Sequence, residues 1–373
     1  MPATYVRVNL AAIASNVQAV LSRLNGTQLM AVVKGNAYGH GMVPVAERCV
    51  IAGAQWLGVS YVDEAVKLRQ AGLTAPTLTF VPPTEEQCRA AVEQDVTVTI
   101  TTEDHLAWLR EAAVQTGKVA TAQIFVDADL GRPSAGNNLV RLLQIAAGFP
   151  QLKITGVYTH FDATDTSSVR GLLDVVKPGS ELHTFAAVVK KLAQQYLGTE
   201  ILFHAAASSL FLTAPDSYLD LVRIGTLLYG QYPSNVPANK CDLDLNPDTF
   251  ELRSTIVAID EVPAGTAVGP GQEFVCRRPT QVATLPLGYA QGLSLVPAFL
   301  TRRQGAWWRR LAGRQGPPVV LIDGQEAPII GRIGMDQCAV DVTDLPDIEV
   351  GQVVVVPTRR TLISPEVPRI YVE

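Results

Sequence analysis

Near the start of the chain, a lysine ends an apolar run. In "LMAVVKGNAYGHGM" (29–42), the four apolar residues Met30 to Val33 lead directly into Lys34 and a loop with three glycines. A partly buried lysine can have a lowered pKa and form a Schiff base. Taken alone, Lys34 is more commonly a strand-end lysine that reaches solvent. The glycines favour the chemical interpretation, because they let the backbone approach a ligand closely. Tyr38 offers that ligand a hydroxyl group.

A second group of polar residues lies between positions 204 and 226. "RIGTLLYG" supplies Arg223, then Gly225 and Thr226 where the next element begins. Backbone N–H groups at such a position bind phosphate. Ser208 could add a hydroxyl group. Alone, Gly225 is equally well explained by a plain turn, and Ser208 by a helix cap.

Two histidines, His160 and His204, also follow or end apolar runs. Each could be a core or rim histidine with its hydrogen bonds satisfied, which is the commoner case for a single histidine. Their spacing fits no simple metal motif, so no metal site is predicted.

The elements that would position these residues are eight β-rich runs that alternate with helix-like segments. The runs are 29–34, 55–60, 77–81, 96–100, 121–127, 154–160, 201–206 and 220–225. Eight strands alternating with helices over about 200 residues are typical of a (β/α)₈ barrel in the α/β class. An open doubly wound sheet is the alternative, but no G-x-G-x-x-G follows a strand to support dinucleotide binding. In a barrel, the polar groups at the strand ends would share one rim.

The pattern changes after "LLYGQYPSNVPANK", where Pro and Asn mark a linker. Short β-rich runs separated by turns follow, including the hairpin signal Asp323-Gly324. We therefore expect a barrel over 11–238 and a mostly antiparallel β domain over 239–373, which the strand at 1–10 could join.

The amino-acid composition indicates the broad class of protein and the compartment. The 373 residues are 47% hydrophobic and 17% charged with a net charge of −5, which fits a folded soluble protein and gives no footprint for nucleic acid or an anionic membrane. No run of about 18 apolar residues could span a bilayer. The five cysteines form no C-x-x-C pair, and the N-terminus lacks a signal-peptide pattern, so a reducing cytoplasm is expected.

Taken together, these segments resemble the alanine racemase family. "AVVKGNAYGHG", "VYTHF", "RIGTLLYG", "LPLGYAQG" and "GRIGMDQCAVDVT" look like its signatures, in order along nearly the whole chain. The resemblance implies a barrel plus a β domain, a pyridoxal 5′-phosphate (PLP) cofactor and a homodimer with composite active sites. It also implies racemisation of a small amino acid, with L-alanine as the first candidate substrate and serine or another amino acid as alternatives.

The resemblance assigns two acid/base residues. Lys34 would hold the cofactor and act on one face of the substrate, and Tyr289 of the other subunit would act on the opposite face, as racemisation requires. The remaining assignments concern binding. Phosphate would be held by Tyr38, Ser208, Gly225 and Thr226; His160 would pack on the pyridine ring; Arg223 would face its nitrogen; and Arg132, Met335 and Asp336 would lie near the substrate.

Several positions depart from the family pattern. Phe125 stands where many members carry a carbamylated lysine, and Asp129 stands where glycine is usual. We hypothesise that Asp129 gives Arg132 its negative partner, because an unpaired buried charge is costly. Unchanged kinetics in Asp129→Ala would refute this hypothesis. Ala207, Gln291 and Gly334 also differ, and we interpret these positions as ringing the substrate side.

Two other functions share this plan. A basic amino-acid decarboxylase would need an acidic partner for the pyridine nitrogen, which Arg223 argues against. A PLP-binding protein without turnover would lack the β domain and Tyr289, and this chain has both.

Overall fold

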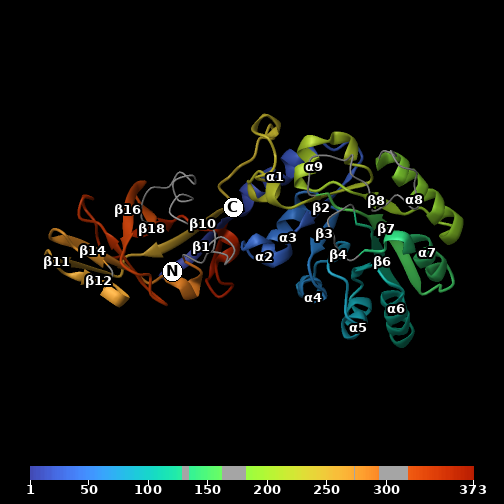
Figure 1. The fold of residues 1–373 in the computed structure, drawn as a ribbon, viewed down its shortest axis with the longest axis horizontal. Helices are drawn as coiled ribbons and strands as arrows, with labels where there is room; N and C mark the ends of the chain where they lie inside the picture. Colours follow the sequence, from blue (N-terminus) through green and yellow to red (C-terminus); the bar gives the residue numbers. More distant parts are fainter. Residues whose placement is uncertain (128–133, 162–181, 273, 294–317) are drawn as a thin grey trace. The chain divides into compact units, whose positions relative to one another are not determined.

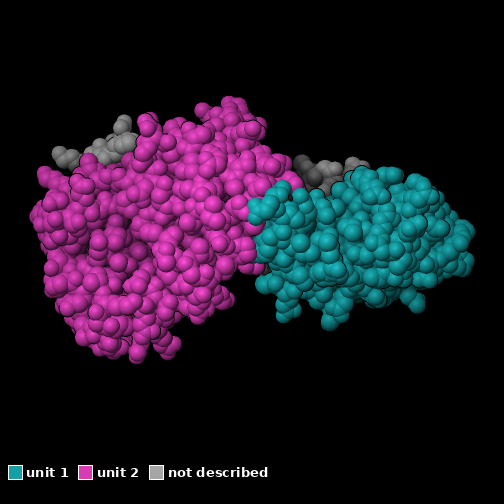
Figure 2. All heavy atoms as spheres, turned by 180° about the vertical axis from the view of Figure 1, so that it is seen from behind, with its two compact units in different colours: residues 1–9, 38–41, 250–373 teal, residues 10–37, 42–249 magenta. Residues whose placement is uncertain are grey.

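The computed structural model describes residues 1–127, 134–161, 182–272, 274–293 and 318–373. The chain divides into two compact units, which Figure 2 colours separately. The barrel unit comprises Leu10–Ala37 and Met42–Thr249, and the β unit comprises Met1–Asn9, Tyr38–Gly41 and Phe250–Glu373.

The described part of the barrel unit contains an eight-stranded parallel sheet (Figure 1). In sheet order its strands are β8 (Leu202–His204), β7 (Leu152–Tyr158), β6 (Ala120–Phe125), β5 (Thr97–Ile100), β4 (Thr77–Thr79), β3 (Trp56–Val59), β2 (Gln28–Val32) and β9 (Leu221–Ile224). The two end strands, β8 and β9, are linked by a parallel bridge between Ala207 and Arg223 and by a 2.9 Å bond from Arg223 N to the Ala206 carbonyl. The sheet therefore nearly closes, which confirms the predicted barrel.

Helices alternate with these strands. They are α1 (Leu10–Leu21), α2 (Lys34–Tyr38), α3 (Met42–Ile51), α4 (Val62–Gln70), α5 (Glu85–Glu93), α6 (Glu103–Thr116), α7 (Leu139–Ala147), α8 (Leu182–Leu197) and α9 (Ser208–Thr213). Short 3₁₀ helices are η1 (Gly136–Asn138), η3 (Pro215–Ser217), η4 (Thr226–Tyr229), η5 (Ala238–Lys240), η6 (Pro270–Gln272), η7 (Tyr289–Gln291) and η8 (Arg360–Leu362). Left-handed glycines follow α3, α4 and α8, at Gly53, Gly72 and Gly198.

The predicted position of Lys34 needs a correction. The sequence placed it at the end of the first barrel strand, but β2 stops at Val32 and Lys34 begins α2. The chain turns into left-handed backbone at Gly35, so the extended ladder cannot continue. Likewise, β7 ends at Tyr158, two residues before His160.

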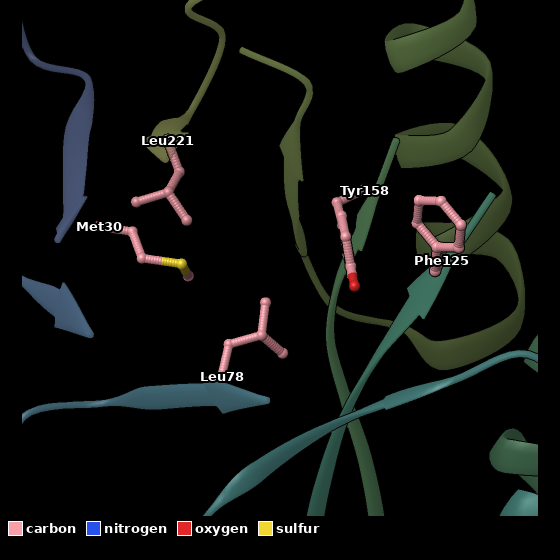
Figure 3. Close-up of a cluster of buried hydrophobic side chains, with 5 residues drawn as sticks. All are labelled: Met30, Leu78, Phe125, Tyr158 and Leu221. Carbon is pink, nitrogen blue, oxygen red and sulfur yellow. The ribbon is translucent and has the colours of Figure 1, made fainter. Parts of the chain in front are cut away.

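A cluster of buried side chains joins strands that lie far apart in the sequence. It comprises Met30, Leu78, Phe125, Tyr158 and Leu221, from β2, β4, β6, β7 and β9 (Figure 3). The half-buried Trp56 and Phe80 pack against it. Phe125 thus adds apolar surface to a core where the family pattern led us to look for a lysine.

In the β unit, the described residues form a nine-stranded, mostly antiparallel sheet. Its order is β11 (Ala258–Val262), β14 (Thr280–Leu285), β17 (Cys338–Asp341), β16 (Gln325–Ile330), β15 (Val319–Ile322), β18 (Val353–Val356), β10 (Phe250–Thr255), β1 (Thr4–Asn9) and β19 (Arg369–Val372). A two-stranded sheet pairs β12 (Ala267–Val268) with β13 (Phe274–Val275). Asp323 and Gly324 both have positive φ and connect β15 to β16, which confirms the predicted hairpin. Across the described chain, no helix has the length and apolarity to cross a membrane.

Candidate active site

The turn after Lys34 has an unusual backbone. Gly35, Asn36 and Ala37 all adopt left-handed dihedral angles, with φ of 62°, 54° and 52°. Non-glycine residues in this conformation cost about 1–2 kcal/mol each, so surrounding contacts must hold the turn. Asn36 Oδ1 accepts a 2.9 Å bond from Met42 N, and Gly35 N donates to Glu64 Oε1 at 2.8 Å. The turn is therefore fixed at both ends, which sets the direction in which Lys34 leaves the barrel strand.

Lys34 lies beside the aromatic side of the barrel cluster. Its Nζ is 5.7 Å from the ring centroid of Phe80, and the residue is half-buried. Phe80 in turn packs edge-on against Tyr158, with ring centroids 6.4 Å apart. The ammonium group thus sits at the boundary of the core, where desolvation and solvent access compete.

The hydrogen-bond acceptors of Arg223 that the structure describes are neutral groups. Only 4% of its surface is exposed. Nη1 bonds to His204 Nδ1 at 2.8 Å, and Nη2 bonds to the Thr159 carbonyl at 2.7 Å, the Ala205 carbonyl at 3.0 Å and His160 Nδ1 at 3.3 Å. These acceptors orient the guanidinium group without neutralising its charge. Because arginine keeps its protons at neutral pH, it can present a permanent positive charge but not a transferable proton.

His204 is a buried neutral histidine. Desolvation by burial, and secondarily the charge of Arg223, lower its pKa well below the ordinary 6.5. Its two ring nitrogens contact Arg223 and Gln123. His204 is therefore a core histidine with both ring nitrogens hydrogen-bonded, as one of the interpretations of the sequence held. One of its two partners, however, is Arg223, the residue expected to face the cofactor.

Burial of His204 makes stability depend on pH. A histidine with a lowered folded-state pKa binds fewer protons than in the unfolded chain, so stability is complete above about pH 6.5 and falls below it, by up to about 1.4 kcal/mol per pH unit. Burial also lowers the pKa of His105, which would add to the pH dependence. The effect of His204 on stability is therefore measured in the variant His105→Gln. Urea unfolding of this variant at pH 7.5, 6.5 and 5.5 should show the fall. Equal stability at all three values would contradict the assignment.

Ser208, Gly225 and Thr226 meet where β8 and β9 end. Gly225 N donates to Ser208 Oγ at 3.2 Å, and Thr226 begins η4 directly after Gly225. The N-cap of α9 is Ala207, so Ser208 is not the cap that the sequence allowed as an alternative. Gly225 has a φ of −116°, so a left-handed turn does not explain the glycine. A hydroxyl group and loop N–H groups in this arrangement suit an anion.

In the β unit, two loops are joined through their backbones. Tyr289 N donates to the Gly334 carbonyl at 3.1 Å, and Ala290 N donates to the Met335 carbonyl at 3.0 Å. A Cβ atom at Gly288 would lie 2.3 Å from these same carbonyl oxygens, so only glycine permits the contact. Tyr289 and Met335, on these two joined loops, are 44% and 56% exposed.

Gln291 has a structural role in this loop. Its Oε1 accepts a 2.8 Å bond from Gly288 N, and its Nε2 bonds to Asp336 Oδ1 at 3.5 Å. It therefore closes the turn that carries Tyr289. The interpretation of this position as lying on the substrate side stays a prediction.

The other predicted residues fall in two groups. Tyr38 belongs to the β unit, where burial raises the pKa of its hydroxyl group and the charge of Arg360 partly opposes that rise. Arg132 and Asp129 lie outside the described residues, so the hypothesis that pairs them stays a prediction.

The sequence analysis missed Gln123. Its signal is a glutamine inside the buried run "AQIFV" of β6.

A barrel with a lysine, an arginine and a Ser208–Gly225 corner that suits an anion near the strand ends, together with a separate β unit, defines a class of two-domain barrel proteins. The family model "Alanine racemase, N-terminal domain" matches residues 8–233, and "Alanine racemase, C-terminal domain" matches residues 249–367. The chain therefore belongs to the alanine racemase family, as the sequence motifs predicted.

Individual relatives agree with this assignment. "Alanine racemase 2" of Caldanaerobacter subterraneus subsp. tengcongensis is 36% identical over 358 residues, which cover 95% of this chain and 85% of the relative. The alanine racemase structure from D-cycloserine-producing Streptomyces lavendulae has a TM-score of 0.79 and 30% identity, covering 99% of this chain and 97% of the other. The alanine racemase structure from Clostridium difficile 630 shares the fold, with a TM-score of 0.84 at 24% identity over 99% and 95%.

Proposed function

We propose that this protein is a PLP-dependent racemase that interconverts L- and D-alanine. The observation that carries the proposal is the buried guanidinium group of Arg223, held by neutral acceptors at the same barrel rim as Lys34. Strand β9, which carries Arg223, and strand β2, which ends two residues before Lys34, are hydrogen-bonded neighbours in the sheet, with Met30 paired to Arg223.

The donor set fits the cofactor. Ser208, Gly225 and Thr226 offer a hydroxyl group and loop N–H groups suited to its phosphate, Tyr38 would add a second hydroxyl group, and Lys34 supplies the primary amine that its aldehyde requires. His160 would pack against the pyridine ring, and Arg132 would lie near the substrate. When bound, PLP withdraws electrons from the substrate's α-carbon.

Arg223 would limit that withdrawal. A guanidinium group facing the pyridine nitrogen supplies positive charge but cannot release a proton to it, since its pKa is above about 12. Arg223 would in this way leave the pyridine nitrogen unprotonated and the bound cofactor a weaker electron sink. This role of Arg223 would favour return of a proton to the α-carbon over transamination or decarboxylation. An acidic partner for that nitrogen, which a decarboxylase would need, is not what this position supplies.

Inversion needs a second proton-transfer group. We propose that Tyr289 of a second copy of this chain is that group, and that Met335 and Asp336 of the same copy lie near the substrate. The exposed Tyr289 and Met335, fixed together by backbone hydrogen bonds, support this proposal because they form a preassembled surface that can be presented to another subunit. Lys34 would hold or release the proton on one face of the substrate and Tyr289 on the other.

The deciding experiment is α-proton exchange. The protein is incubated with PLP and each L-amino acid in D₂O, and loss of the α-proton signal is followed together with chiral chromatography. Exchange with formation of D-alanine is expected. Exchange with serine or another amino acid instead of alanine would change the assigned substrate and leave the proposed mechanism unchanged. No exchange with any amino acid, in protein that binds PLP, would overturn the proposal in favour of cofactor binding without turnover.

Ser208→Ala tests the phosphate corner. Losing one hydrogen bond to a charged group costs about 1.5–3 kcal/mol, so the Kd for PLP should rise by roughly 10- to 100-fold, while kcat at saturating PLP changes little. Ser209→Ala is the matched control, because Ser209 is the next residue of α9 and its hydroxyl group bonds instead to Asn235 at 2.9 Å. Equal PLP affinities in the two variants would remove Ser208 from the site. Equilibrium dialysis with PLP gives both constants.

A further inference from the structure

We infer that Gln123 is a positioning residue for Arg223, acting through His204. The side-chain oxygen of Gln123 accepts a 2.8 Å bond from His204 Nε2, and His204 Nδ1 accepts a 2.8 Å bond from Arg223 Nη1. The inference rests on the proposed function, in which Arg223 faces the pyridine nitrogen. No family motif in the sequence analysis includes Gln123.

The order of protons along this chain of three side chains follows from Arg223. A guanidinium group has only donors, so the His204 nitrogen that faces it must be an acceptor. The neutral ring then carries its one proton on Nε2, which must donate to the Gln123 oxygen. If the Gln123 amide were turned over, two donors would face each other at one end of the imidazole ring. The amide oxygen thus stabilises the tautomer that Arg223 requires by accepting its Nε2 proton.

The barrel is locally shaped to hold this amide. The β6–β7 ladder shifts register between Ala122 and Gln123, so that Gly156 lies opposite Gln123. A Cβ atom at Gly156 would lie 3.1 Å from both Cδ and Nε2 of Gln123 and 3.0 Å from the Leu202 carbonyl oxygen. Such irregularities re-aim side chains next to functional sites. Both the bulge and the glycine are needed to place a glutamine side chain here.

Stability alone does not explain Gln123. The residue is fully buried, and among the described residues its Nε2 has no hydrogen-bond partner. A buried donor without an acceptor destabilises the fold, and an apolar side chain of similar shape would avoid that loss. The polar contact that Gln123 does make is the one to His204. Its chemistry therefore serves that histidine.

The stacking contact of His204 with Tyr158 does not involve the ring nitrogen Nε2, which bonds to Gln123. Tyr158 stacks on the imidazole ring, with centroids 5.0 Å apart and planes 6° from parallel. The Tyr158 hydroxyl group is held in turn by Thr99 Oγ1 at 2.8 Å. Stacking fixes the plane of the ring but not which nitrogen carries the proton. The hydrogen bond to Gln123 is the contact that pairs the Nε2 proton of the tautomer that Arg223 requires.

The first test is Gln123→Leu, which keeps the approximate shape and removes the acceptor. We expect kcat for alanine to fall by about 10- to 100-fold with KM within about 2-fold, because the buried Nε2 proton of His204 loses its acceptor and Arg223 loses its fixed partner. Gln28→Leu is the matched control. Gln28 is also a barrel-strand glutamine whose side-chain oxygen accepts a ring N–H, from Trp56 Nε1 at 2.9 Å, but it does not contact His204. We expect its kcat to stay within about 2-fold of wild type, whatever stability it loses.

A second variant, Gln123→Glu, keeps the acceptor but adds a charge. Among the described residues, the charged and titratable groups facing His204 would then be Arg223 from β9, Tyr158 from β7 and the new carboxylate on β6. His160 does not face His204 directly but hydrogen-bonds to Arg223. A carboxylate beside Nε2 stabilises the imidazolium form, which takes the acceptor away from Arg223. We expect near-normal kcat at high pH and a new ionisation that lowers kcat as pH falls. A merely structural role would give no new ionisation.

Nuclear magnetic resonance gives a readout that needs neither substrate nor cofactor. The chain has five histidines, so the ¹⁵N-histidine spectrum is simple, and the spectrum of His204→Asn assigns the His204 signals. Wild type should show a protonated Nε2 and an unprotonated Nδ1 from pH 5.5 to 8, and Gln123→Leu should lose the slow solvent exchange of the Nε2 proton. A proton on Nδ1, or Gln123→Leu with unchanged exchange and unchanged kcat, would overturn the inference. Absence of racemisation in wild type would overturn the proposed function, while the spectra would still decide the tautomer.

Discussion

Lys34→Ala should abolish racemisation, with a loss of at least about 10⁴-fold in kcat/KM, because the substitution removes both the covalent attachment of the cofactor and one acid/base group. Chiral chromatography of alanine after long incubation with concentrated protein measures the residual rate. The variant should also lose the cofactor mass that borohydride fixes to the wild-type peptide containing Lys34.

The structure indicates that this variant will fold. The left-handed residues begin at Gly35, so Lys34 itself has ordinary backbone angles that alanine adopts readily. The hydrogen bonds that hold the turn come from Gly35, Asn36 and Glu64, none of which is changed. Lys153→Ala is the control, because Lys153 is an exposed lysine on the barrel strand β7. Activity in Lys34→Ala above about 1% of wild type would exclude Lys34 as the cofactor lysine.

The barrel could be predicted because its signals are local. Continuous apolar runs such as "LMAVV" need cover on both faces, which is what parallel strands receive, and the spacing of eight β-rich runs already implied closure. The hairpin at Asp323-Gly324 was equally local, since both residues tolerate positive φ. In each case, the physical cause lies within a few neighbouring residues.

The support around the site could not be predicted in the same way. Gln123 and His204 lie 81 positions apart. The side chain of Gln123 fits beside His204 because the β6–β7 pairing shifts register there and places Gly156, which has no side chain, opposite Gln123. The hydrogen bond from Gly288 N to the side-chain oxygen of Gln291 is a second contact that the sequence pattern did not indicate. Hydrogen-bond partners depend on tertiary packing, and one sequence does not encode them in a local pattern.

Tyr289→Phe should separate exchange from racemisation. It removes the hydroxyl group on one face of the substrate, so interconversion of the enantiomers should fall by about 10²–10⁴-fold. The enantiomer whose α-proton faces Lys34 should still exchange that proton for deuterium, with retention of configuration. Proton NMR and chiral chromatography of L- and D-alanine in D₂O measure the two processes together. Loss of exchange for both enantiomers to the same extent would contradict a role on one face only.

Mixing the two inactive variants tests where Tyr289 acts. If each site combines Lys34 of one subunit with Tyr289 of the other, a mixed dimer of Lys34→Ala and Tyr289→Phe contains one complete site. After subunit exchange, half of the dimers are mixed and half of their sites are complete, so about a quarter of wild-type activity should return. Lys34→Ala mixed with the double variant Lys34→Ala/Tyr289→Phe should stay inactive. If Tyr289 served its own subunit, no mixed dimer would contain a complete site. The recovered activity therefore distinguishes a composite site from one built within a single chain.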